Sequence, residues 1–177
     1  VRARGRGCGL KAHVEGMDPI GGAGLAAELG CVSAEHLVRA SDAGIEAMAR
    51  AGTVAVLLPA TSFDLDKPYA RARQMVEAGV AVAAATDFNP GSSPNLNLQF
   101  PMNLACLRYK LTPAEALTAV TLNGAAAIRR CETIGSIEVG KQADLVVWNA
   151  PDLEYIFCRY GNNLVDRVVK NGVVVVE

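Results

Sequence analysis

The 177-residue sequence has no excess of charge of either sign, since its formal net charge is −1. Proteins that bind nucleic acids or membrane surfaces are usually basic. The one basic cluster (Arg2, Arg4 and Arg6) is short and glycine-rich, and we interpret it as an irregular terminus. Long apolar runs are also lacking, because none approaches the ~20 residues that span a bilayer. We therefore expect neither a nucleic-acid partner nor a membrane location.

Cysteine pairs with regular spacing are missing as well. The sequence has five cysteines, none of them in a Cys-x-x-Cys pair, at positions 8, 31, 106, 131 and 158. An odd and unpatterned set is typical of free thiols in a reducing compartment, and it argues against a disulfide framework or a structural zinc site. We therefore expect a cytoplasmic protein.

An initiator methionine and a secretion signal are absent from the start, which reads Val-Arg-Ala-Arg. We expect this chain to be the C-terminal part of a longer protein. Apolar residues, in contrast, are abundant at 51% of the sequence. That content is enough for a substantial core and argues against disorder.

A rhythm of strand and then helix runs through residues 10–130. Apolar segments that predict strands lie at 10–13, 31–37, 53–58 and 80–86. Helices are expected at 21–29, at 42–50 after the capping residue Ser41, and between Pro68 and Gly79. Thr-Pro-Ala-Glu at 112–115 is a capping box, which predicts a helix at 113–122, and a short helix should follow at 124–130.

Strands separated by helices predict a parallel sheet with right-handed crossovers. The fold class is therefore α/β. Four such units make either half of an eight-stranded barrel or a small open sheet.

The pattern changes after Cys131. Residues 134–141 and 143–148 are predicted to be short strands, and 165–169 and 173–176 to form a hairpin with Asn171-Gly172 at its turn. We place a domain boundary here, with a half-barrel domain at 1–132 and a small β domain at 133–177.

Three side chains with catalytic potential lie at the ends of predicted strands. His13 closes the first strand, His36 lies within or just after the second, and Asp87 directly follows the fourth. In a barrel of this kind, active sites are built at the carboxyl ends of the strands. For each residue a structural role is the alternative, as a hydrogen-bonded histidine or as a turn or cap aspartate. The residues alone leave both interpretations open.

The segment 140–147, Gly-Lys-Gln-Ala-Asp-Leu-Val-Val, resembles the C-terminal signature of the amidohydrolase superfamily, and residues 112–126 resemble its last barrel helices. This resemblance implies part of a metal-bearing (β/α)8 TIM-type barrel, its C-terminal half, followed by a small β-sandwich tail.

A finer resemblance is to the imidazolonepropionase family. It rests on Asp-Pro-Ile-Gly-Gly at 18–22, on residues 32–37 and 54–59, on Thr-Asp-Phe-Asn-Pro-Gly-Ser-Ser at 86–93, and on Tyr160-Gly161. It implies hydrolysis of the cyclic amide of 4-imidazolone-5-propanoate to N-formimidoyl-L-glutamate in histidine degradation. The partner implied is this small-molecule substrate, and a homodimer is expected.

The same resemblance assigns roles to individual residues. It implies that His13 and Asp87 bind one Zn²⁺ or Fe²⁺ ion, which suits imidazole and carboxylate ligands. Asp87 would also take a proton from the metal-bound water, and His36 would polarise the scissile carbonyl or donate a proton to it. Asn89, Gly91 and Ser92 would hold the propionate arm of the substrate, with backbone N–H groups of the turn suited to a carboxylate.

Two departures from the family pattern accompany these matches. The family's His-x-His pair of metal ligands is not in this sequence. The family's substrate-binding Glu is replaced by Gly16, and Glu15 stands one residue earlier, either as a substitute substrate ligand or as a surface charge. Another cyclic amidohydrolase or deaminase, or an inactive fragment, therefore stays open as an alternative.

Overall fold

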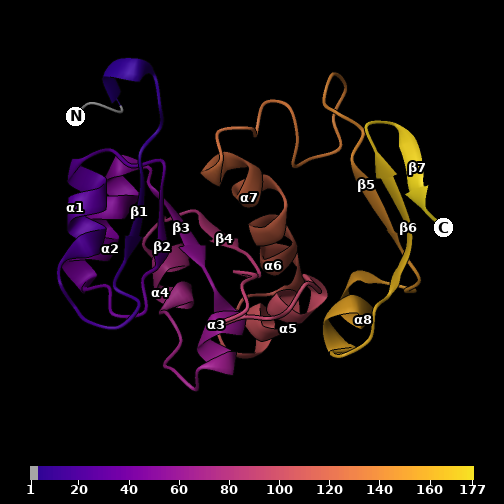
Figure 1. Ribbon diagram of the computed structural model, residues 1–177, viewed down its shortest axis with the longest axis horizontal. Helices are drawn as coiled ribbons and strands as arrows, with labels where there is room; N and C mark the ends of the chain where they lie inside the picture. The colour runs from indigo at the N-terminus through magenta and orange to yellow at the C-terminus, as the bar shows by residue number, and fades with distance from the viewer. Residues whose placement is uncertain (1–3) are drawn as a thin grey trace.

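The computed structural model describes residues 4–177 and contains two separate sheets (Figure 1). The first is parallel, with its strands in the order β1-β2-β3-β4, and the second is antiparallel, in the order β5-β6-β7. The strands of the parallel sheet are β1 (Lys11–Val14), β2 (Ser33–His36), β3 (Val54–Leu57) and β4 (Val82–Ala84). The helices associated with it are η1 (Arg4–Arg6), α1 (Gly22–Glu28), α2 (Asp42–Ala51), α3 (Pro59–Asp64), α4 (Ala72–Glu77), α5 (Gln99–Leu107), α6 (Pro113–Val120) and α7 (Leu122–Ala127).

The predicted α/β fold is thus confirmed, and all four strands lie where the sequence places them. Within residues 4–177 the parallel sheet stays open, because β1 and β4 do not pair with each other. None of the helices in this part of the chain is long and apolar enough to cross a membrane.

Strand β3 is buried on both faces, as its continuous apolar run predicts. Ala55 and Leu57 belong to the main core, which also contains residues of α1 and α2. Val54 and Val56 point to the opposite face and pack with Ala127 of α7 in a second, smaller cluster. The side of the sheet away from α1 and α2 is therefore apolar at β3.

The same side of the sheet is polar at β1 and β2. Lys11 and His13 are exposed there, and Glu35 is paired in register with His13. The Lys11 Nζ lies 3.3 Å from Glu35 Oε1. Polar groups therefore gather on the half of the sheet that contains the two histidines.

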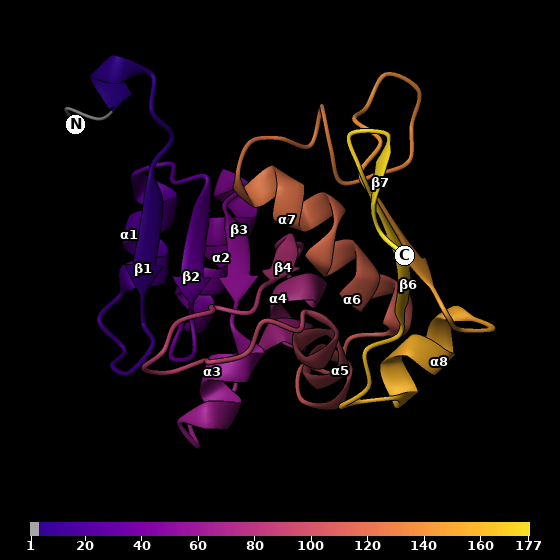
Figure 2. The same ribbon diagram turned by 45° about the vertical axis from the view of Figure 1, so that its right-hand side comes forward.

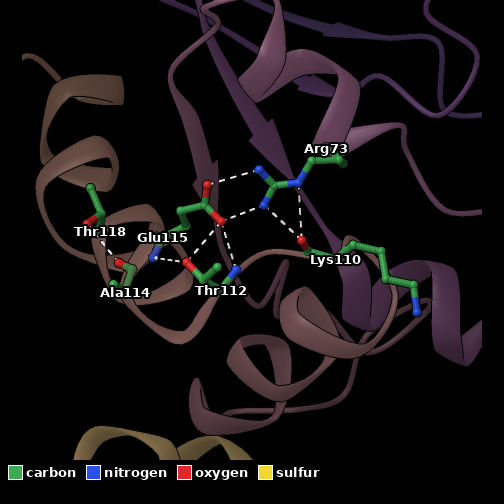
Figure 3. A network of polar contacts seen from close by, with 6 residues as sticks. All are labelled: Arg73, Lys110, Thr112, Ala114, Glu115 and Thr118. Carbon is green, nitrogen blue, oxygen red and sulfur yellow. Dashed lines mark hydrogen bonds and ion pairs between the residues drawn. The ribbon is translucent and has the colours of Figure 1, made fainter.

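The predicted helix starts at Ser41 and Thr112 are confirmed. The Ser41 hydroxyl accepts a hydrogen bond from the N–H of Gly44 at 3.1 Å. At α6, the Thr112 hydroxyl and the Glu115 carboxylate cap each other's backbone N–H groups. Arg73 also contacts Glu115, with Nη1 3.0 Å from Oε1, and donates to the carbonyl of Lys110 (Figure 3). One carboxylate therefore joins the start of α6 to α4.

The helix expected between Pro68 and Gly79 begins later than predicted, at Ala72. The carbonyl of Pro68 instead accepts a hydrogen bond from Ser62 Oγ at 3.1 Å, so the residues before α4 are tied to α3. Helices α3 and α5 were not predicted. Pro59, which directly follows the strand predicted at 53–58, is the first residue of α3.

The tail contains β5 (Leu145–Trp148), α8 (Leu153–Cys158), β6 (Val165–Lys170) and β7 (Val173–Val176). The hairpin of β6 and β7 is confirmed, with Asn171 and Gly172 both at positive φ in its turn. The strand predicted at 134–141 is wrong, because Gly135 and Gly140 adopt φ values of 97° and 92° that turn the chain. The tail of this chain is one three-stranded sheet, and α8 was not predicted.

Helix α8 packs against the parallel-sheet unit and so connects the tail to it. Ile156 and Phe157 are buried in the main core. The side-chain amide of Asn103 in α5 donates to the carbonyls of both residues, at 3.2 and 2.8 Å, and the amide of Gln99 also donates to that of Ile156. Figures 1 and 2 show α8 beside α5, below the antiparallel sheet. The domain boundary after residue 132 stays a prediction.

Candidate functional site

His13, His36 and Asp87 meet at the carboxyl edge of the parallel sheet. Their strands β1, β2 and β4 run in the same direction, and the strand arrows in Figure 2 point to one edge, beside α3. The ring centroids of His13 and His36 are 4.3 Å apart, with the rings edge to face at 73°. The negative charge of the Asp87 carboxylate raises the pKa of the His36 imidazole. The predicted convergence is therefore present, whereas the role of each residue stays a prediction.

The environment of His36 favours the neutral imidazole. Burial lowers the pKa of His36 below its ordinary value of 6.5, and the neighbouring His13 lowers it further. Asp87 and Glu35 act in the opposite direction. A neutral imidazole can donate one N–H to an oxygen while its other nitrogen accepts a hydrogen bond.

Asp87 is held by a hydroxyl group from the neighbouring strand-to-helix turn. Thr61 Oγ1 in α3 donates to Asp87 Oδ2 at 2.6 Å. The Asp87 side chain caps no helix in the part of the chain that the structure describes, since α5 begins only at Gln99. Sequence analysis did not single out Thr61, because a threonine in the first turn of a short helix carries no distinguishing pattern.

The turn after Asp87 is organised by the Asn89 side chain. Its Oδ1 accepts hydrogen bonds from the N–H groups of Gly91 and Ser92, both at 2.9 Å, and its Nδ2 donates to the Asp87 carbonyl at 2.7 Å. The Ser92 hydroxyl also contacts the Asn89 amide. The backbone N–H groups expected to be free for a carboxylate are thus already bonded within the turn. Substrate binding by Asn89, Gly91 and Ser92 stays a prediction.

Glu15 is not a surface charge, and that interpretation is wrong. Its side chain is only 3% exposed, and its two oxygens accept the N–H groups of Gly21 and Ala23 at 3.1 and 3.0 Å. Both bonds lie at the start of α1, where free N–H groups favour an anion. A substrate contact by Glu15 stays a prediction.

Gly16 lies against the ring of His36. A Cβ atom added to Gly16 would be 3.5 Å from the His36 Cγ, which is ordinary van der Waals contact. The position at which the family has its substrate-binding Glu therefore lies beside His36. The glycine in this chain has no side chain there that could bind a substrate.

Three of these residues have a left-handed backbone. The φ angles of Glu15, His36 and Asp87 are 55°, 70° and 52°. Such conformations cost roughly 1–3 kcal/mol for residues with a Cβ atom and cluster at functional sites. All three lie at or just after the end of a parallel strand, as does Leu37, whose φ is 56°. Left-handed residues are not confined to this edge, because Asp66, Lys110, Arg129 and Asn171 also have positive φ.

The side chains of this edge do not form a complete metal site. Among residues 4–177, no three His, Cys, Asp or Glu side chains are grouped so that they could hold one ion. Catalytic zinc usually has three protein ligands. The donor set of this chain therefore does not by itself fit the metal implied by the resemblance.

The sequence matches the model of the amidohydrolase family over residues 2–175. The chain belongs to the amidohydrolase family. This amidohydrolase is 56% identical to imidazolonepropionase of Bacillus velezensis over 177 residues, which is 99% of this chain and 42% of that protein. It is 52% identical to imidazolonepropionase of Alkaliphilus metalliredigens, with the same coverage of both chains. The resemblance inferred from the motifs is therefore confirmed, and the chain spans less than half the length of these relatives.

Solved structures of longer chains share this fold. A zinc-bound adenosine deaminase from Xanthomonas campestris superposes with a TM-score of 0.86 at 26% identity, covering 99% of this chain and 47% of that one. Atrazine chlorohydrolase from Arthrobacter aurescens, complexed with zinc and atraton, gives a TM-score of 0.82 at 22% identity and covers 99% and 46%.

Proposed function

We propose that this chain is the C-terminal portion of an imidazolonepropionase, whose complete form hydrolyses 4-imidazolone-5-propanoate to N-formimidoyl-L-glutamate. The observation that carries the proposal is the 56% identity to the B. velezensis imidazolonepropionase across 99% of this chain. The meeting of His13, His36 and Asp87 at the carboxyl edge of the sheet supports it, because a hydrolytic site of this family needs such groups at that edge.

In the proposed reaction, water adds across the ring C–N bond beside the carbonyl. The oxygen of water bonds to the carbonyl carbon, the bond to the ring nitrogen breaks, and that nitrogen takes up a proton. Asp87 accepts the proton from the attacking water and passes it to the departing ring nitrogen. His36 donates a hydrogen bond to the carbonyl oxygen, which stabilises the negative charge that develops there.

The other candidate residues at this edge bind the substrate and take no part in breaking the C–N bond. Asn89, Gly91 and Ser92 contact the propionate arm, with Glu15 as a further candidate. We include one Zn²⁺ or Fe²⁺ ion in the proposal, with His13 and Asp87 as two of its ligands. The described residues offer no group of three metal donors. The remaining metal ligands would therefore have to come from the part of the full-length protein that corresponds to the unmatched part of the relatives. A homodimer in the cytoplasm is the expected form of the complete protein.

A fusion protein tests this proposal. Residues 1–177 are joined behind the part of the B. velezensis enzyme that they do not match, and hydrolysis of 4-imidazolone-5-propanoate is followed. We expect hydrolysis, and a loss of about 10²–10⁴-fold in kcat for Asp87→Asn and His36→Gln.

Two other results would contradict the proposal. A folded fusion that opens hydantoin or dihydroorotate, or that deaminates guanine, in preference to the imidazolone would identify a different amidohydrolase. A folded fusion with no activity on any of these substrates would favour the inactive-fragment hypothesis. Circular dichroism, with the intact B. velezensis enzyme as the reference, establishes folding.

A further inference from the structure

We propose that Thr61 is a positioning residue for Asp87, a role that rests on the proposed hydrolysis. The Thr61 hydroxyl donates to Oδ2 of the Asp87 carboxylate at 2.6 Å, and Thr61 is only 7% exposed. Within residues 4–177 no hydrogen bond is donated to Oδ1. The bond from Thr61 therefore fixes the rotation of the carboxylate and leaves Oδ1 as the oxygen that faces the reaction.

The hydroxyl of Thr61 lies too near the start of α3 to bond within the helix, because the residue four positions earlier is Leu57 of β3. Hydroxyls of threonines further along a helix commonly donate to the carbonyl four residues earlier. Thr118 and Thr121 do so, with bonds of 2.9 Å to the Ala114 carbonyl and 2.7 Å to the Leu117 carbonyl. Thr61 instead donates to the Asp87 side chain in the segment after β4, so its hydroxyl contributes to the site and not to the helix.

Helix α3 is a rigid support for this hydroxyl. Only Leu58 separates strand β3 from Pro59, the first residue of α3, so the helix starts at the carboxyl edge of the sheet. Ser62 in the same helix is bonded to the carbonyl of Pro68, and Phe63 packs edge to face on Phe100 with ring centroids 5.2 Å apart. The contacts of the two residues that follow Thr61 therefore restrict its movement.

The Asp87 side chain needs such support because the bond to its backbone, from Asn89 Nδ2 to the Asp87 carbonyl, does not fix the carboxylate. It lies beyond the last residue of β4 at a φ of 52°, and it is followed at once by the Asn89 turn. An aspartate carboxylate rotates easily about its last bond. A catalytic group displaced by ~1 Å can lose about 10²-fold in rate.

The test replaces the hydroxyl with a methyl group of the same size. In the fusion protein described above, we expect Thr61→Val to lower kcat by about 10–100-fold while KM changes less than about twofold. Thr61→Ser keeps the hydroxyl and should recover most of the rate. Thr53→Val is the matched control, because Thr53 is also buried and donates to a backbone carbonyl, that of Cys31, away from the site.

A second measurement does not depend on activity. In the 177-residue chain labelled with ¹³C at the aspartate carboxyl carbons, we expect Thr61→Val to shift the Asp87 signal, and Thr61→Ser and Thr53→Val to leave it in place. An unshifted Asp87 signal, or an unchanged kcat in the Thr61→Val fusion, would overturn the inference. If the fusion with Thr61 intact is inactive, the proposed function fails, and the carboxyl signal alone decides whether Thr61 orients Asp87.

Discussion

Asp87, His36 and Glu15, at the edge of the parallel sheet, each contact a group from another element of the fold. Asp87 is bonded to Thr61, His36 is packed against His13, and Glu15 caps the start of α1. The places of His13, His36 and Asp87 at the ends of predicted strands were readable from the sequence, and the ends of parallel strands share an edge. Sequence analysis could not predict Thr61 or the burial of Glu15. Both depend on which hydroxyl or N–H group the folded chain brings within reach.

Glu115 allows a test of a single charged contact. The Arg73 side chain, followed by the N–H of Thr112, lowers the pKa of Glu115 from 4.5 to about 2 (Figure 3). Because this pKa is lower in the folded state, the contact stabilises the fold fully above pH ~4.5 and is lost as the pH falls towards 2. We expect Glu115→Gln to lower the free energy of unfolding by about 1 kcal/mol at pH 7, allowing for partial exposure of the pair, and by much less at pH 3.

Urea unfolding of both proteins at pH 7, 4 and 3 measures this difference. Glu46→Gln is the control, since Glu46 and Arg50 form an exposed pair at 3.7 Å that should contribute less than about 0.5 kcal/mol. Equal losses at all three pH values would contradict the assigned role of the Glu115 charge.

At the scale of elements, hydrophobic pattern and capping residues identified most of the parallel unit. The apolar runs located β1 to β4, and Ser41 and Thr112 marked the starts of α2 and α6. The helices that were missed are α3, α5 and α8. In α3 and α8 only six residues are helical, so neither shows a full amphipathic period. In α5, the polar residues Gln99 and Asn103 are buried because their amides donate to carbonyls of α8. A buried polar face does not give the apolar pattern by which a helix is predicted from sequence.

The packing of α1 on β1 can be tested at two glycines of one helix. A Cβ atom on Gly22 would lie 2.5 Å from the Cβ of Val14, whereas one on Gly24 would meet no atom within 4 Å. We therefore expect Gly22→Ala to destabilise the fold by about 1–3 kcal/mol. Gly24→Ala is the matched control and should be neutral or stabilising by up to ~1 kcal/mol, since alanine favours helix. Thermal or urea unfolding of the two variants would refute this packing if Gly22→Ala were the more stable.

For the molecule as a whole, the incomplete donor set predicts weak metal binding. We expect the purified 177-residue chain to retain far less than one equivalent of Zn²⁺ or Fe²⁺ after dialysis, because three grouped donors are absent from residues 4–177. Mass spectrometry of the dissolved metals measures the content. The fusion with the unmatched part of the B. velezensis enzyme is the positive control and should hold one ion per chain. A full equivalent in the 177-residue chain alone would contradict the two-ligand argument.

The order of the strands has a consequence for how the chain folds. Lys11 pairs with Ser33, and Ser33 in turn pairs with Val54, so every neighbour in the parallel sheet is also the next strand along the chain. Pairing between consecutive strands closes the shortest loops that a parallel sheet allows, which limits the entropy cost of closing them. During synthesis, each strand can dock on one that has already left the ribosome. Helix α8 is the exception, because its carbonyls bond to amides of α5 far back in the chain. Its docking is therefore a late step, and until then the buried face of α5 is open to unwanted association.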